Sequence, residues 1–427
     1  MPNSFFFLVL LMACSIAPAA WGAPDEEILG KDAGYPVQRF GSSFSMFKEE
    51  FKVGTFSHMD KVLWPRNVKG AGTPSSLPMG DPLPPISYPY DNKTFSLDDF
   101  LSRQRITGLL IIKDGKVALE RYQYARLPDM RFSSFSMAKT VVAMLIGIAV
   151  RDGFIASLDD RAEKYAPELR GSAWGEVTIR NMLRMSSGVK WSDKVGPGLE
   201  SDGAKLTAQS FYQRGRGGAS AVNWVKDREF EQGTRFNYNS AETFALGVVL
   251  KGAIKQDLSN YLSEKIWQPM GAESDAAWLI DWSGLEAGNC CLNARLRDYG
   301  RLGMLLANDG SWNGKELVPR DFMLDATDAA RQPEYLRPRN ASQFFGYGYQ
   351  TWIYPYRTRT FQARGLFGQE LIVQPDSKVV IVMTSVLKSP DVTNEIFVER
   401  NYFTGAVLKA LGGKTDLYQK GAAPVQR

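Results

Sequence analysis

One segment of the chain stands out because almost none of its positions is polar. Residues 137–150 read MAKTVVAMLIGIAV, so apolar side chains point to nearly every face of a helix formed there. A helix that is apolar all round is buried in the protein core. The pattern therefore predicts a central helix that begins at Ser136 and ends at Gly153.

Runs of residues typical of β-strands occur before this helix and again near the C-terminus. Residues 106–112 and 117–122 flank a Lys-Asp-Gly-Lys turn and predict a hairpin, and further strands are predicted at 348–354, 370–374 and 379–385. Helices are predicted in between, at 177–185, 242–255, 258–269 and 293–308, and a last one at about 394–411. This order predicts an α/β fold with a mostly helical subdomain inserted at about 158–285.

The N-terminal part has a different character. Seven prolines fall between about residues 65 and 90, a density that disfavours regular secondary structure. We therefore expect an extended, Pro-rich N-terminal segment at 23–94, a compact domain at 95–415 and a short tail at 416–427.

Residues 1–22 resemble a secretory signal, with an apolar run from Phe5 to Met12 and small residues before an acidic stretch. We expect cleavage near Gly22 and export, in bacteria to the periplasm. The alternative is a lipoprotein anchored through Cys14, and only in that case is a membrane expected as a partner. No other stretch has the roughly 18 uncharged apolar residues of a membrane span.

The charge distribution and the cysteine content argue against several kinds of function. The 51 basic and 46 acidic residues are interspersed, which argues against a nucleic-acid partner. Cys290 and Cys291 are adjacent, and we expect two buried small apolar residues rather than a vicinal disulfide or a redox pair. No cluster of Cys and His offers a metal site, and no cofactor is predicted.

A serine nucleophile would need a base other than histidine. The only histidine, His58, lies before the Pro-rich stretch, and no G-x-S-x-G sequence occurs. Lysine or tyrosine could then accept the serine proton. The pattern S-x-x-K occurs four times, at Ser45, Ser136, Ser187 and Ser385.

Helix context distinguishes the copy at Ser136. There the serine opens the apolar helix, and Lys139 follows one turn later on the same face. Burial of Lys139 would lower the pKa of its amine, and the helix N-terminus favours a developing oxyanion. The competing interpretation is a helix cap at Ser136 with Lys139 in solvent.

Three motifs in order resemble the serine β-lactamase-like family of penicillin-binding proteins, class C β-lactamases and related esterases. They are FSMAKT at 135–140, GTRFNYNS at 233–240 and ARGLFGQ at 363–369. The resemblance extends from about residue 95 to 410, and the branch of 6-aminohexanoate-dimer hydrolase-like enzymes is similar in the third motif. It implies a β-lactamase/transpeptidase-like fold, with an antiparallel sheet flanked by helices.

The resemblance also implies roles for individual residues. Ser136 would attack a carbonyl carbon, Lys139 and Tyr238 would transfer protons, and the backbone N–H groups of Ser136 and Leu366 would form an oxyanion hole. Ser240 would hydrogen-bond in the site, with Asn239 as a less favoured substitute. The remaining positions assigned to substrate binding are Gly365, Gly368 and Gln369.

The third motif departs from the penicillin-recognising form, because Ala363 stands where that form has a lysine. Leu366 and Phe367 in place of small residues predict an apolar cleft, and Arg364 is either a source of positive charge or a surface arginine. The expected activity is hydrolysis of a small-molecule amide or ester. The alternatives are a D-Ala peptidase or a β-lactamase, and a non-catalytic binding protein of the same fold.

Overall fold

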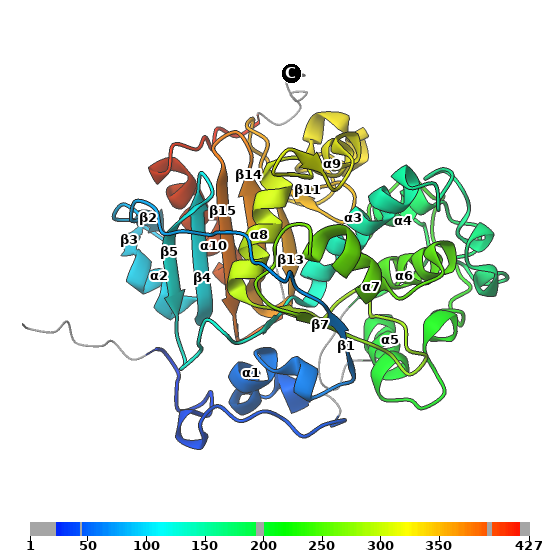
Figure 1. Ribbon diagram of the computed structural model, residues 1–427, viewed down its shortest axis with the longest axis horizontal. Coiled ribbons are helices and arrows are strands. Elements are labelled where there is room, and N and C mark those ends of the chain that lie inside the picture. The colour runs from blue at the N-terminus through cyan, green and yellow to red at the C-terminus, as the bar shows by residue number, and fades with distance from the viewer. Residues whose placement is uncertain (1–22, 43–44, 194–199, 391–394, 419–427) are drawn as a thin grey trace, which may run out of the picture.

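A seven-stranded antiparallel sheet forms the centre of the molecule in the computed structural model (Figure 1). Its strands follow the spatial order β11-β12-β13-β14-β15-β4-β5, so the N-terminal hairpin lies beside the C-terminal strands. The strand bounds are β4 Ile106–Lys113, β5 Lys116–Tyr122, β11 Gly346–Tyr347, β12 Trp352–Ile353, β13 Phe361–Gly365, β14 Gln369–Gln374 and β15 Val379–Ser385.

The structure describes residues 23–42, 45–193, 200–390 and 395–418. The predicted signal segment with Cys14, and residues 419–427 of the predicted tail, lie outside these ranges. Within them, no helix has the length and apolarity needed to cross a bilayer.

Helices cover both faces of the sheet. The alternation of side chains along β4 puts Leu110 and Ile112 into one core with α3 (Ala138–Arg151) and α8 (Leu296–Ala307). The opposite face, with Leu109 and Ile111, packs on α2 (Leu97–Arg103) and α10 (Glu395–Ala410). The sheet is therefore buried on both sides, which explains its continuous apolar strands.

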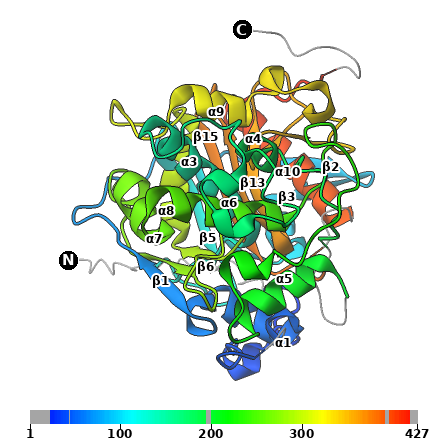
Figure 2. The same ribbon diagram turned by 90° about the vertical axis from the view of Figure 1, so that its right-hand side faces the viewer.

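The inserted region is helical, as predicted. It contains α4 Ile179–Leu183, α5 Asp202–Phe211, α6 Ser240–Ile254 and α7 Leu258–Leu262, and α6 packs against α3. Figure 2 shows α3, α4 and α6 gathered on the side of the molecule that faces the viewer. A further helix, α9 Arg320–Thr327, and the short pair β9 Ser311–Trp312 and β10 Lys315–Glu316 precede the last strands.

The N-terminal segment is more ordered than its prolines indicated. It contains helix α1 Glu49–Phe56, strand β1 Pro65–Val68 and the hairpin of β2 Ser87–Tyr90 with β3 Lys93–Ser96. Strand β1 is the edge of a second sheet with the order β1-β7-β8-β6, whose other strands are β7 Ala276–Leu279, β8 Leu292–Ala294 and β6 Phe132–Ser133. Proline is tolerated at strand starts and edges, so the expectation of no regular structure was wrong here.

The compact part also begins earlier than residue 95. Val53 and Phe56 of α1 are buried against Phe135 and Phe367, which come from two of the three sequence motifs. The N-terminal segment is thus packed onto the site rather than extended away from it.

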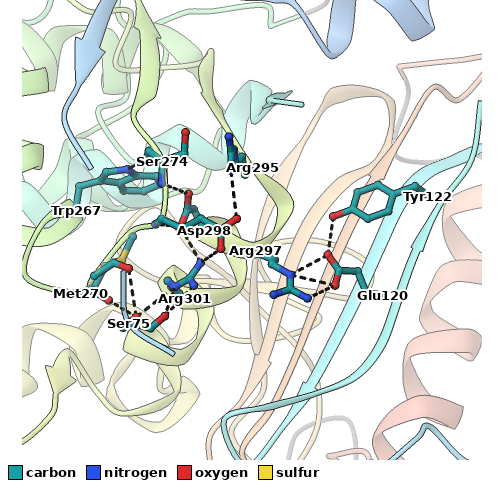
Figure 3. A network of polar contacts seen from close by, with 12 residues as sticks. Ser75, Glu120, Tyr122, Trp267, Met270, Ser274, Arg295, Arg297, Asp298 and Arg301 are labelled. Atoms are coloured by element: carbon teal, nitrogen blue, oxygen red, sulfur yellow. Dashed lines mark hydrogen bonds and ion pairs between the residues drawn. The ribbon is translucent and has the colours of Figure 1, made fainter. Parts of the chain in front are cut away.

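A buried network of charged groups fixes α8 to the rest of the fold (Figure 3). Asp298 accepts hydrogen bonds from the backbone N–H groups of Glu273 (2.8 Å) and Ser274 (3.2 Å) and forms an ion pair with Arg301 (3.0 Å). Arg301 in turn donates to the carbonyl of Ser75 (2.9 Å). The network therefore joins α8, the loop before β7 and the N-terminal segment.

Replacing Asp298 with alanine should destabilise the fold strongly. Burial raises the pKa of Asp298 to about 6, so at about pH 8 the variant removes a charged acceptor and leaves Arg301 buried without this partner. We expect the free energy of unfolding in urea to fall by about 3–5 kcal/mol. Asp321, whose side chain is 87% exposed in its ion pair with Arg331, is the matched control, and Asp321→Ala should cost less than about 1 kcal/mol. Equal losses in the two variants would contradict this account.

Candidate active site

Ser136 lies at the entrance to the central helix. Strand β6 ends at Ser133, a 3-10 turn follows at Phe135–Met137, and α3 runs from Ala138 to Arg151. Phe135 has a left-handed backbone with φ of 42°, which turns the chain sharply before the serine. The predicted buried helix is confirmed, and Ser136 sits partly exposed at its N-terminal end.

The amine of Lys139 lies among three oxygen atoms. Its Nζ is 3.0 Å from Ser136 Oγ, 3.0 Å from Ser240 Oγ and 2.8 Å from the carbonyl oxygen of Asn289. The lysine is only 2% exposed. Burial lowers the pKa of Lys139 to about 8, and the nearby charge of Asp193 acts in the opposite direction. The interpretation of Lys139 as a solvated side chain is therefore wrong.

Asp193 is a second partner of Ser240, in addition to Lys139. Its carboxylate accepts hydrogen bonds from Ser240 Oγ (2.8 Å), from the Ser240 backbone N–H (3.1 Å) and from Trp191 Nε1 (2.9 Å). Ser240 begins α6, so the carboxylate also lies at a helix N-terminus, where negative charge is favoured. Burial raises the pKa of Asp193, while Lys139 beside it lowers the pKa.

The phenol ring of Tyr238 lies near the Lys139 amine. The lysine amine is 5.2 Å from the centroid of the phenol ring, and the ring stacks on Trp352 at 5.5 Å. Burial raises the pKa of Tyr238 well above its usual range, and the neighbouring Ser136 hydroxyl only partly offsets this effect. Asn239, the next residue, caps α6 through the Ala241 N–H and is fully buried, so it does not substitute for Ser240.

Gly365 ends β13 where the strand passes the turn that carries Ser136. A Cβ atom at this position would lie 2.3 Å from the Ser134 carbonyl oxygen and 3.1 Å from the Ser136 nitrogen. Only glycine allows this close approach. Leu366 follows directly and lines the same cavity as Ser136.

Gly368 and Gln369 support this turn from behind. The Gln369 amide donates to the carbonyls of Leu366 (3.1 Å) and Ser385 (2.8 Å), and the Gly368 carbonyl accepts from Arg400 (2.7 Å). Both positions are buried, and neither lines the described cavity. Gln369 holds the backbone of Leu366 in place, and the expected contact of the two residues with substrate stays a prediction.

Arg364 is neither a surface arginine nor a charge directed at the cavity. It is 8% exposed, its guanidinium lies 4.9 Å from the Phe345 ring centroid, and it pairs with Glu370 at 3.4 Å. Glu370 is shared with Arg400 at 2.9 Å. Ala363, on the other face of β13, is buried in the main core.

Cys290 and Cys291 form a vicinal disulfide, contrary to our expectation of two free thiols. Neighbouring cysteines need an unusual backbone to meet, and Cys291 supplies it with a φ of 73°. The Cys291 N–H donates to the Phe135 carbonyl (3.2 Å), and Trp278 Nε1 donates to the Cys290 carbonyl (3.0 Å). The disulfide thus borders Ser136 and follows the Asn289 carbonyl that contacts Lys139.

Sequence reasoning missed two groups of this site. Asp193 lies 47 positions before Ser240, outside all three motifs, and no spacing rule connects the two residues. The Asn289 carbonyl is a backbone atom, which carries no residue signature. The adjacent cysteines were the one visible sign that the backbone near residue 289 is unusual.

The antiparallel sheet with its inserted helical region, and a site where the two meet, define the β-lactamase/transpeptidase-like fold. The family described as Beta-lactamase matches residues 97–397, and the chain belongs to this family. The protein is accordingly a hydrolase of the β-lactamase-related serine class.

Individual relatives agree with this placement. The 6-aminohexanoate-dimer hydrolase of Paenarthrobacter ureafaciens is 24% identical over 300 residues, which cover 69% of this chain and 76% of the relative. A solved structure from Bacillus anthracis, assigned as a 6-aminohexanoate-dimer hydrolase, superposes with a TM-score of 0.77 at 23% identity and covers 87% of this chain and 97% of its own. A family VIII carboxylesterase superposes with a TM-score of 0.55 at 14% identity, over 71% of this chain and 92% of its own. The two superpositions bear on the fold alone.

Proposed function

We propose that this protein hydrolyses a small-molecule amide or ester through an acyl-enzyme on Ser136. The observation that carries the proposal is the position of the Lys139 amine, 3.0 Å from Ser136 Oγ in a buried setting. A lysine with a pKa near 8 has a substantial neutral fraction at neutral to alkaline pH and can accept the serine proton. The relative named 6-aminohexanoate-dimer hydrolase adds support from similarity.

The two proton-transfer groups have different parts in this proposal. The raised pKa of Tyr238 keeps its phenol protonated throughout the range in which Lys139 loses its proton. Lys139 is therefore the general base, and Tyr238 is a hydrogen-bond donor near Ser136 that can pass a proton to the leaving group. In this proposal Lys139 and Tyr238 therefore have separate roles, whereas the sequence predicted only that the two residues transfer protons together.

Ser136 Oγ attacks the carbonyl carbon as its proton moves to Lys139 Nζ, and the oxyanion is held by the N–H groups of Ser136 and Leu366. Collapse breaks the bond to the leaving alcohol or amine, which takes a proton delivered from Lys139 by way of Tyr238. Water then attacks the acyl-enzyme with the same base, releasing the acid and restoring Ser136.

Asp193 fixes the direction of the hydrogen bonds around the base. An ionised carboxylate only accepts, so the Ser240 hydroxyl donates to Asp193 and presents a lone pair to Lys139. The Asn289 carbonyl also only accepts. Both N–H groups of a neutral amine are then engaged, and its lone pair is left for the Ser136 hydroxyl. Asp193 is thus a positioning residue in this proposal.

Removing the Ser136 hydroxyl should abolish both labelling and turnover. We expect wild type to react with an activated fluorophosphonate and to hydrolyse p-nitrophenyl esters or short amides, and Ser136→Ala to lose at least about 10³-fold in kcat/KM because no nucleophile remains. Ser187→Ala, at another S-x-x-K sequence whose hydroxyl is bonded to Glu242, is the control. Turnover by Ser136→Ala equal to wild type would refute the mechanism. Nitrocefin turnover at the rate of the esters would instead favour a β-lactamase.

The pH dependence should report the base. Lys139 must be neutral to accept a proton, and burial lowers its pKa to about 8, so activity rises as pH increases through this value. We expect kcat/KM for an ester substrate to fall about tenfold for each pH unit below it. Rates measured from about pH 6 to about pH 10, corrected for uncatalysed hydrolysis, test this. A flat profile would exclude Lys139 as the base, and an inflection near that of an ordinary lysine would contradict the lowered pKa.

Asp193→Asn should shift the pH profile of kcat/KM, which a simple loss of packing would not do. Without the negative charge the pKa of Lys139 falls further, so the acidic limb of kcat/KM moves to lower pH. The amide can also donate to Ser240 and reverse the chain of hydrogen bonds, so the plateau should fall about tenfold or more. Asp202→Asn, the same substitution at a carboxylate that accepts from the nearby Ser192 N–H, is the control. A lower plateau with an unmoved acidic limb would reduce Asp193 to a structural residue.

A further inference from the structure

A small cavity beside Ser136 is walled in part by the N-terminal segment. The cavity has a volume of about 70 Å³, and four of its lining residues, Met46, Phe47, Met59 and Leu63, come from this segment. Leu206 and Phe211 of α5 line the other side. The space next to the nucleophile is therefore bounded by chain segments that share no sequence motif.

The N-terminal wall lies outside the part of the chain that matches the family. That match begins at residue 97, more than thirty positions after Leu63. The wall thus lies outside the residues that the family model matches, and that match does not imply any selectivity of the wall.

This wall is anchored firmly to the site. Phe56 packs against Phe135 with ring centroids 4.8 Å apart, and against Phe367 at 5.3 Å. Lys52, which is 1% exposed, donates to the carbonyl of Leu387 at 3.0 Å. Strand β1 pairs with β7 just beyond it, and Figures 1 and 2 both place α1 at the same end of the molecule as α5. The cavity is therefore preformed by packed elements.

The chemistry of the wall indicates an uncharged, apolar occupant. The four N-terminal side chains carry no hydrogen-bond donor and no charge, and none of the described residues that line the cavity is Lys or Arg. The one lining carboxylate, Asp193, already accepts three hydrogen bonds from Ser240 and Trp191. A charged group would lose its water without meeting a counter-charge here. The hydroxyls of Thr207 and Ser210, on α5, also line the cavity, but none of the four N-terminal side chains adds a polar group.

The volume limits the length of that occupant. An apolar cavity of about 150 Å³ accommodates a benzene molecule, so about 70 Å³ corresponds to roughly half of that. A straight aliphatic chain of about two to four carbons beyond the carbonyl fits this space, which is an acyl group of about three to five carbons in all. Methionine side chains can adapt their shape, which allows modest extension but not a long chain.

We propose that residues 45–63 form the acyl subsite of this hydrolase and select substrates with a short, uncharged aliphatic acyl group. This inference rests on the proposed function, because it assigns the cavity to the group attached to Ser136. The acyl group stays covalently bound through a turnover and suits a walled space. The leaving group must depart before water attacks, so it belongs on the open side.

A chain-length series of p-nitrophenyl esters tests the assignment with a constant leaving group. Wild-type kcat/KM should be highest for acyl chains of about three to five carbons and should fall about tenfold or more by the octanoate ester. Phe47→Ala should raise the octanoate-to-butyrate ratio by about tenfold, and Phe47→Trp should lower it, because they widen and narrow the same space. Met79→Ala, at a methionine that is 64% exposed and does not line the cavity, should leave the ratio as in wild type.

The outcomes separate this inference from the function on which it depends. If wild type hydrolyses the short esters and both Phe47 variants keep its chain-length profile, the subsite is wrong while the proposed function stands. If wild type hydrolyses no ester and Ser136 is not labelled by a fluorophosphonate, the proposed function itself fails. A second series with a constant acyl group and alcohols of increasing length should show no comparable effect of Phe47→Ala. An equal effect there would overturn the acyl assignment.

Discussion

The arrangement of the site depends on one constraint, the burial of a lysine amine among oxygen atoms. An amine that is taken out of water needs hydrogen-bond partners, and Lys139 finds them in Ser136, Ser240 and the Asn289 carbonyl. These three partners come from the start of α3, the start of α6 and the loop before β8. Each element has to hold its oxygen atom within hydrogen-bond distance of the Lys139 amine. The packing of α3 against α6 and the disulfide beside Asn289 both help to keep these oxygen atoms in place.

The parts of the fold that could be predicted are those where a local pattern coincides with burial. Residues 137–150 are apolar on nearly every face, so a buried helix is the structure that suits them. The strand at 379–385 was predicted with the same bounds that the structure shows. The β-lactamase-like fold, predicted from three motifs in order, is confirmed by the family match. Ser136, Lys139 and Ser240 could be assigned together because those motifs place them on the first turns of two packed helices.

The rest depends on contacts between distant segments, which leave no local pattern. Asp193 reaches Ser240 from a loop, and the N-terminal segment reaches Phe135 and Phe367 across the sequence. Prolines made that segment look unstructured, yet Pro65 and Pro89 occupy an edge strand and a two-stranded hairpin, where a missing N–H costs little. The adjacent cysteines were misjudged because their pairing depends on the backbone angle of Cys291 and not on composition.

The altered third motif follows from the packing around β13. Ala363 points into the main core beneath α3, so a lysine there would bury a charge among apolar side chains. Arg364 points to the other face, where Glu370 neutralises it, and Glu370 is itself bound by Arg400. The strand that passes Ser136 therefore offers its Gly365 backbone and no cation that is free to bind a carboxylate. A substrate recognised through a carboxylate would meet no counter-charge from this strand, whereas a neutral ester or amide needs none. The apolar wall contributed by the N-terminal segment also favours an uncharged substrate.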